Sequence, residues 1–188
     1  MKSKLLWMSL LLLMMAGCSS DDDAETVDGI VSLGGGVVYD GYAYQQIDET
    51  NPLSVFFGAE LHQPRWDQYG NVDKSFFEQG EWDDESVLVI NSREEFQKAY
   101  MGTKELPDVD FNQFTLVIGR TWGNDSSYGL NNVVLRDMGF TYELETQLFH
   151  NTNRVGFAAI QTIFYWRLYS KLSEKAMIIK RTVTGVYD

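Results

Sequence analysis

The chain has 188 residues, of which 27 are acidic and 15 are basic, so that its net charge is −12. This length is enough for one domain with a substantial hydrophobic core. The acidic balance argues against binding to nucleic acid, whose phosphates require patches of lysine and arginine, and against attraction to an anionic membrane surface. Because the chain has a single cysteine, it contains no internal disulfide bond, and packing must hold the fold together.

The first residues have the pattern of a secretory leader. Two lysines precede an apolar run, residues 5–16, which is shorter than the about 20 residues that a membrane-spanning helix needs. The run ends in Met15-Ala16-Gly17-Cys18, which resembles a bacterial lipobox. We therefore expect residues 1–17 to be a lipoprotein signal peptide and Cys18 to carry the lipid, such as palmitate. The alternative is an ordinary cleaved leader followed by an incidental cysteine.

An acidic segment follows the cysteine directly. Residues 18–28 are predicted to form a flexible tether, because serine and aspartate favour solvation over burial. Its start, Ser19-Ser20-Asp21-Asp22-Asp23, resembles the surface-export signal of Bacteroidetes lipoproteins, although the same run can serve as a tether alone. The expected location is the outer membrane, with the domain lipid-anchored and exposed at the cell surface.

Residues 29–188 are predicted to form a single domain. Its first two runs, Ile30–Leu33 and Val37–Tyr44, have β propensity and are separated by Gly34-Gly35-Gly36. Three glycines permit positive φ angles, so they predict a turn or a loose joint between two short strands. A phosphate-binding loop would also contain glycines, but no helix and no lysine follow these.

The segment Gln45–Asp84 shows little periodicity and contains two of the three prolines. Short strands are predicted at Ser54–Glu60 and Lys74–Glu78. A long loop is the alternative, and long loops inside compact domains are often functional.

A strand and a helix are better defined in the next part of the chain. Val87–Ile90 is a continuous apolar run that predicts a buried strand. Ser92 and Glu95 have the spacing of a capping box. The Ser92 hydroxyl is expected to accept the backbone amide of Glu95, and the Glu95 carboxylate is expected to accept that of Ser92. Apolar residues then follow at helical spacing, and Gly102 is the predicted C-terminal cap of a short helix.

The remainder of the chain predicts strands. Phe114–Trp122 is apolar on both faces, as expected for a central strand, whereas Thr141–Phe149 alternates between apolar and polar residues, as expected for a strand with one wet face. Three further strands are predicted at Asn132–Met138, Ala158–Tyr169 and Ala176–Tyr187. Short links between consecutive strands favour an antiparallel meander. The predicted fold class is therefore α+β and strand-rich, with one short helix packed on the sheet.

Two motifs in this half of the chain resemble a known family. Val87–Phe96, with the sequence VLVINSREEF, and Leu106–Gly119, with the sequence LPDVDFNQFTLVIG, resemble the C-terminal domain of the protease-complex subunit PrcB and of related Bacteroidetes lipoproteins. The resemblance covers about residues 87–184. It departs at residues 126–130 and 164–169, where the family has a glycine-rich turn and a proline-led motif. The resemblance implies a small binding or stabilising domain without catalytic residues.

Catalytic and metal sites have little support in the sequence. The only histidines are His62 and His150, and no serine lies in a glycine-x-serine-x-glycine motif. Asp108, Asp110 and Asn112 have the spacing that begins a calcium loop, but the glycine and glutamate that must follow are absent. Asp110 is therefore predicted to turn the chain, with Phe111 buried. Carboxylate pairs for glycoside hydrolysis could be formed among Glu78, Glu81, Asp83, Asp84 and Glu85. Any acidic protein contains such pairs, so they are weak evidence for a hydrolase.

Aromatic residues offer the clearest candidates for a binding site. Trp66, Tyr69 and Trp82 lie among polar residues and are candidate contacts for a protein partner or a glycan. For Trp66 and Tyr69 the sequence leaves open whether the side chain is exposed or buried. Phe76, Phe77 and Trp122 are predicted to be core residues. The sequence thus predicts an accessory protein that has no catalytic activity, cofactor or metal and binds an unidentified protein partner. A glycan-binding lipoprotein is the alternative, and a hydrolase is a weaker third.

Overall fold

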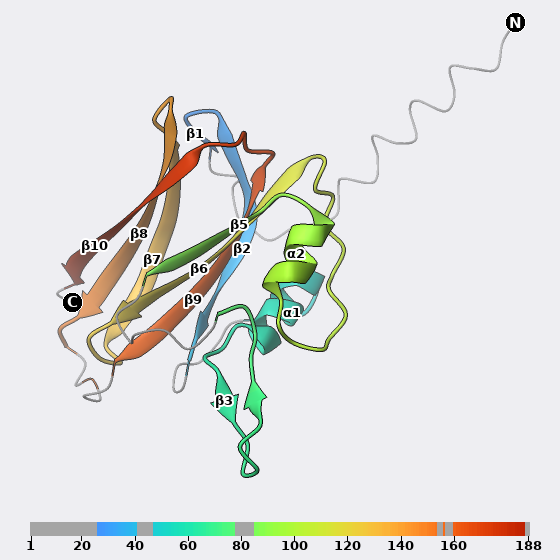
Figure 1. The fold of residues 1–188 in the computed structure, drawn as a ribbon. Helices are drawn as coiled ribbons and strands as arrows, with labels where there is room; N and C mark the ends of the chain where they lie inside the picture. Colours follow the sequence, from blue (N-terminus) through green and yellow to red (C-terminus); the bar gives the residue numbers. More distant parts are fainter. Residues whose placement is uncertain (1–25, 41–46, 78–84, 154–155, 157–159, 187–188) are drawn as a thin grey trace, which may run out of the picture.

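The computed structural model describes residues 26–40, 47–77, 85–153, 156 and 160–186. The predicted signal peptide, Cys18 and Trp82 lie outside the described residues. So does most of the predicted tether, residues 18–28, of which Thr26–Val27 forms the short strand β1. Figure 1 shows the fold.

The described chain forms three sheets and two short helices. In chain order the elements are β1 (Thr26–Val27), β2 (Ile30–Tyr39), α1 (Pro52–Glu60), β3 (Arg65–Trp66), β4 (Val72–Asp73), β5 (Ser86–Ile90), α2 (Arg93–Ala99), β6 (Phe114–Gly123), β7 (Tyr128–Asp137), β8 (Thr141–Asn151), β9 (Gln161–Ser170) and β10 (Ala176–Val186). The largest sheet has the order β1-β2-β9-β6-β5, the second has the order β10-β8-β7, and β3 pairs with β4. The strand-rich α+β class is therefore confirmed.

These elements stack in three layers, with the two helices on one face of the five-stranded sheet and the three-stranded sheet on its other face (Figure 1). The core under the helices is rich in aromatic residues, namely Phe56, Phe57, Phe76, Phe77, Phe96, Tyr100, Phe164 and Trp166. The core between the sheets is mainly aliphatic and includes Leu130, Val133, Leu135, Leu144, Leu148 and Ile163. The central strands β6 and β9 supply side chains to both cores, which explains why Phe114–Trp122 is apolar on both faces.

The order of the strands differs from a simple meander. All pairings in the five-stranded sheet are antiparallel, but β6 pairs with both β5 and β9. The strand β9 begins more than 35 residues after β6 ends. In the second sheet β7 and β8 form an antiparallel hairpin, while β10 pairs with β8 in parallel. The parallel pairing arises because the chain leaves β9 and crosses from one sheet to the other before β10 begins.

The prediction of a strand at Ser54–Glu60 is wrong, because this segment belongs to the helix α1. The Asn51 side chain accepts hydrogen bonds from the backbone amides of Leu53 and Ser54, and proline occupies the first helical position. An asparagine N-cap followed by proline is a strong helix start. The predicted strand at Lys74–Glu78 is also wrong, since β4 ends at Asp73.

The helix predicted from the capping box is confirmed as α2, with two differences at its ends. The Ser92 hydroxyl accepts the Glu95 amide at 3.1 Å, but the Glu95 carboxylate reaches back to the amide of Asn91, at 2.6 Å. The helix ends at Ala99, with Tyr100 as C-cap. Gly102 has a different role, because a Cβ there would lie 2.3 Å from the Tyr100 hydroxyl.

The three glycines do not form a turn, since β2 runs through them as one strand. The register with β9 shifts between Ser32 and Gly35, which marks a β-bulge. A Cβ at Gly36 would lie 2.5 Å from the indole nitrogen of Trp166, and one at Gly35 would lie 2.4 Å from the Trp166 carbonyl oxygen. The glycines therefore allow the large side chain of Trp166 to lie against the neighbouring strand.

Candidate partner-binding arm

A small hairpin projects from the body of the molecule at the end opposite to β1 (Figure 1). It consists of β3, β4 and the turn 67–71 between them, and Trp66 pairs with Val72 across its two strands. We call residues 65–73 the arm. The arm contains Trp66 and Tyr69, two of the three predicted contact residues.

The turn of the arm is organised by Asp67. One oxygen of its carboxylate accepts the amides of Tyr69 at 2.8 Å and Asn71 at 2.9 Å, and the other accepts the Asn71 side-chain amide at 2.7 Å. The Asn71 side chain and these backbone amides hold the pKa of Asp67 below its usual value. Gly70 has a φ of +83°, a conformation that glycine adopts without strain. The turn is therefore ordered by its own residues.

The arm presents apolar side chains to solvent. Tyr69 is 81% exposed, Trp66 54% and Val72 41%. The sequence left open whether Trp66 and Tyr69 are exposed or buried, and the structure places both at the surface. Large aromatic side chains on a projecting element are typical of residues that become buried in a complex.

The base of the arm is tied to the body by side chains from several elements. The Arg65 guanidinium lies 3.5 Å from the Asp40 carboxylate, which also accepts the Gln63 amide. The Gln63 side chain donates to the Thr162 hydroxyl of β9 at 3.0 Å. Pro64 is buried at the point where the chain enters the arm.

His62 belongs to this base. Its imidazole is 4% exposed, its Nδ1–H donates to the Gln63 carbonyl at 2.7 Å, and its Nε2 lies 3.7 Å from the Asp73 carboxylate. The ring therefore links the end of α1 to β4.

A buried carboxylate completes the base. Glu60, at the end of α1, accepts a hydrogen bond from the Tyr100 hydroxyl at 2.5 Å and lies 2.8 Å from the Lys104 ammonium group. Burial alone would raise the pKa of Glu60, but the bonds from Lys104 and Tyr100 outweigh it and hold that pKa below its usual value. Burial, together with the bond to Glu60, raises the pKa of Tyr100 to about 12. Tyr100 therefore stays a hydrogen-bond donor at physiological pH.

The aromatic core continues directly beneath this base. Phe76 and Phe77, which follow the arm, are 4% and 6% exposed, so the prediction that they are core residues is confirmed. Phe76 stacks on Phe96 of α2 with ring centroids 6.0 Å apart, and Phe77 stacks on Phe164 of β9 at 5.8 Å. The chain returning from the arm is thus held by both α2 and the sheet.

The other candidate residues in the described part of the chain contact neighbouring side chains. Trp122 is half-buried and not a full core residue, and the Arg181 guanidinium lies 4.0 Å above its ring. His150 stacks on Tyr128 with ring centroids 4.4 Å apart. Glu85 accepts the Thr121 hydroxyl at 2.9 Å, while the other carboxylates considered for glycoside hydrolysis lie outside the described residues.

The calcium-like spacing belongs to a turn, as predicted. The Asp110 carboxylate accepts the Asn112 amide at 3.0 Å and the Gln113 side chain at 2.8 Å. Phe111 is half-buried, with its ring against Phe96. Within the described ranges, no group of three or more histidine, cysteine, aspartate or glutamate side chains is placed to hold a metal ion.

Sequence reasoning missed the arm itself and its base. The signal for the arm was present, because Asp67-Gln68-Tyr69-Gly70-Asn71 is a five-residue loop with turn-forming residues between Trp66 and Val72. The link between Glu60 and Tyr100 had no comparable signal, since it joins two helices 40 residues apart.

Comparison of the chain with models of known protein families gives no match, and neither do comparisons with curated proteins and with solved structures. The similarity to the C-terminal domain of PrcB therefore stays a prediction. In the part of the chain that the structure describes, neither helix has the length and apolar character that crossing a membrane requires.

Proposed function

We propose that this chain is a lipid-anchored accessory protein of the outer membrane that binds or stabilises a protein partner at the cell surface through the arm. The proposal assigns the anchor to Cys18 and the contact to Trp66 and Tyr69, and it includes no catalytic step. The observation that carries it is the exposure of two large aromatic side chains on a projecting hairpin whose turn is ordered.

The shape of the arm favours a protein over a glycan. Sugar rings usually bind in grooves, where aromatic faces and polar groups surround them. Trp66 and Tyr69 instead lie on a convex hairpin, which suits insertion into a cleft of another protein. Tryptophan and tyrosine are also the residues most enriched among energetic hot spots of protein interfaces. The glycan alternative would use the same two residues together with Trp82.

The partner is best sought by pull-down from gently solubilised membranes, with the wild-type chain and three variants compared. We expect Trp66→Ala and Tyr69→Ala each to weaken capture by about 30-fold, the equivalent of a 2 kcal/mol hot spot. Gln68→Ala is the matched control, because Gln68 is an exposed neighbour in the same turn. Capture that is equal for all four chains would refute the arm as the contact site. Binding on a glycan array that Trp66→Ala abolishes would favour the alternative.

The anchor has its own test. Cys18→Ala is expected to release a folded domain from the membrane fraction, because acyl chains hold a protein at a bilayer by about 0.8 kcal/mol per buried methylene group. Protease added to intact cells should digest the wild-type protein. Unchanged membrane attachment of the variant would refute the anchor, and full protection from protease would refute exposure at the cell surface.

A further inference from the structure

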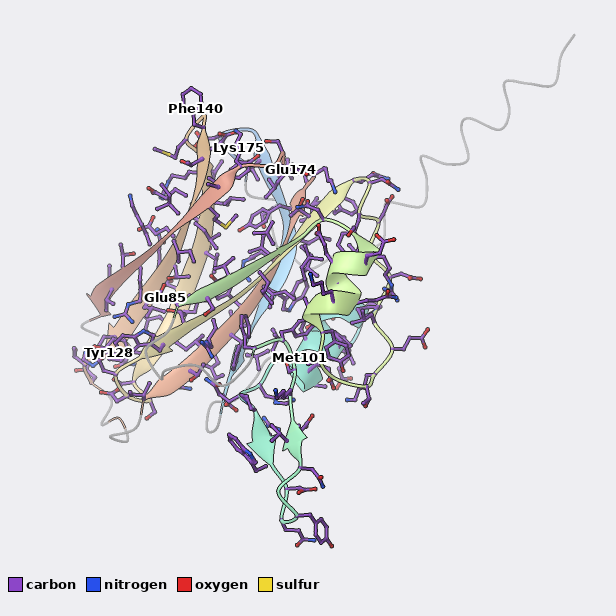
Figure 2. The ribbon with its side chains drawn as sticks, in the orientation of Figure 1. Glu85, Met101, Tyr128, Phe140, Glu174 and Lys175 are labelled. Atoms are coloured by element: carbon purple, nitrogen blue, oxygen red, sulfur yellow. The ribbon has the colours of Figure 1, made fainter. Side chains whose placement is uncertain are left out.

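The end of the molecule opposite to the arm also carries an exposed aromatic side chain. Phe140 lies in the turn between β7 and β8 and is 96% exposed, and Met138 beside it is 57% exposed. Figure 2 shows Phe140 at the extreme end of the molecule, pointing away from it, with Lys175 nearby. Turns of this kind usually carry polar residues or glycine.

The turn holds these side chains in a fixed position. Gly139 has a φ of +86°, its amide donates to the Asp137 carboxylate at 2.8 Å, and the Met138 amide donates to the Thr141 carbonyl at 2.9 Å. Lys175 binds the same carboxylate, at 2.6 Å. The exposure of Phe140 is therefore a property of an ordered turn.

A third apolar residue lies close by. Ala176 of β10 is paired with Thr141, so Ile178 lies two positions along the neighbouring strand from the turn. Ile178 is 48% exposed. We call Met138, Phe140 and Ile178 the apolar tip.

The charge around the apolar tip differs from that of the chain as a whole. Segments 136–145 and 171–180, which form this end, carry four basic and four acidic side chains, whereas the whole chain has a net charge of −12. The Asp137 charge is met by Lys175, and the Glu143 and Glu145 charges are met by Arg136. These two segments are neutral in sum and do not themselves repel a negatively charged lipid surface, whereas the acidic charge at this end lies in the tether, on Asp21, Asp22, Asp23, Glu25 and Asp28.

The tether enters the fold at the same end. β1 contacts β7, and Figure 1 shows β1 beside the turn between β7 and β8. Thr26 lies eight positions after Cys18, and a fully extended chain of that length spans at most about 29 Å. A lipid on Cys18 would therefore hold this end of the domain, and not the arm, close to the bilayer.

We propose that the apolar tip inserts into the interface of the lipid bilayer to which the chain is anchored. This inference rests on the proposed lipid anchor at Cys18. Insertion moves Phe140 and Met138 from water into an apolar medium, which is favourable in proportion to the apolar area removed from water. With the anchor and the tip as two contacts on one end, the domain stands on the membrane with its arm directed outward.

Depth-dependent quenching tests this orientation. The full lipidated chain with Met138→Cys has one free thiol, because Cys18 carries the lipid, and this thiol takes a fluorophore. The protein is reconstituted into vesicles of phosphatidylethanolamine and phosphatidylglycerol that contain lipids with nitroxide-labelled acyl chains. We expect quenching at position 138, loss of that quenching in a second chain that also carries Phe140→Asp, and none at position 69 in the control Tyr69→Cys.

The possible outcomes are distinct. Circular dichroism first establishes that each variant is folded, which is expected because Met138, Phe140 and Tyr69 are all exposed. A protein that floats with the vesicles but is unquenched at position 138 overturns the apolar tip and leaves the anchor intact. A fluorophore at position 138 that is shielded from solvent but unquenched by lipid indicates a protein contact and also overturns it. A protein that does not float overturns the anchor, and the tip proposal with it.

Discussion

The two hairpins at opposite ends of the molecule have similar turns, but the strands that carry these turns differ in length. In each, an aspartate accepts the backbone amide two residues further on, and an aromatic residue beyond it is exposed: Tyr69 at 81% after Asp67, and Phe140 at 96% after Asp137. The strands of the arm, however, have two residues each, whereas β7 and β8 have ten and eleven.

This difference determines what supports each tip. The turn between β7 and β8 rests on a long backbone ladder whose inner face is buried in the core between the sheets. The arm has only two paired positions, too few for independent stability. It is tied to the body by Arg65, which lies 3.5 Å from Asp40, and by Asp73, which lies 3.7 Å from His62; behind His62, the bond from Tyr100 to Glu60 joins the ends of the two helices. The arm should therefore respond to changes that leave the other hairpin unaffected.

The largest difference in stability is expected between two phenylalanine variants, one at a buried position and one at the exposed apolar tip. Phe57 is fully buried, with its ring against Phe76, which follows the arm, and against Trp166, so Phe57→Ala should lower the free energy of unfolding by about 3–5 kcal/mol, measured by chemical denaturation. Phe140→Ala is the matched control and should change it by less than about 0.5 kcal/mol. Similar losses for the two variants would contradict the packing described for the two ends.

Two tyrosine hydroxyls allow a direct comparison of the hydrogen bonds near the base of each hairpin. Tyr100→Phe removes a donor to the buried Glu60 carboxylate and should cost about 1.5–3 kcal/mol, the range for hydrogen bonds to charged groups. Tyr142→Phe removes a neutral bond to Ser173 beside the other hairpin and should cost about 0.5–1.5 kcal/mol. Hydrogen exchange should show faster opening of the arm amides in Tyr100→Phe alone. Faster opening in both variants would mean that the arm does not depend on this base.

Acid should weaken the base of the arm through Glu60. Its pKa is held below the ordinary value of 4.5, so its contribution to stability is fully present above about pH 4.5 and is lost as the pH falls through its folded-state pKa. We expect the stability of the wild-type chain to depend more steeply on pH in this range than that of Glu60→Gln. Parallel pH profiles of unfolding would show that this carboxylate does not contribute.

The smallest effect on global stability is expected at Asp67, which belongs to the arm turn alone. Asp67→Ala should leave the unfolding midpoint almost unchanged and broaden or shift the arm resonances in NMR spectra. It should also weaken capture of the partner. Asp67→Asn keeps an acceptor oxygen for the amides of Tyr69 and Asn71 and should retain most of the capture. If Asp67→Ala bound the partner as well as wild type, a preformed turn would not be needed for recognition.

The strands that the sequence predicted well are those whose environment leaves a local pattern. β6 is buried on both faces and therefore has a continuous run of apolar residues, whereas β8 is buried on one face and alternates between apolar and polar residues. The helix α2 was predictable because its N-cap and its apolar stripe lie within eight residues. The class of fold follows from such elements even when their order in the sheets does not.

The failures occurred where distant residues decide the local structure. Gly34, Gly35 and Gly36 suggest a turn on local grounds, but Trp166, 130 residues later, requires glycine in the strand beside it. The parallel pairing of β10 with β8 likewise depends on how the chain crosses between sheets. Exposure of Trp66 and Tyr69 was left open for the same reason, since only the tertiary fold decides whether a hairpin lies against the body or projects from it.

Strand β2 has a mechanical consequence. It begins next to β1, runs the length of the sheet antiparallel to β9, and ends at Tyr39. The carboxylate of the next residue, Asp40, lies 3.5 Å from Arg65 at the base of the arm. A pull between the tether and the arm would therefore load β2 along its own axis. Its hydrogen bonds to β9 lie across that direction and would share the force and break together, instead of opening one after another. The domain is thus built to resist tension applied between its two ends.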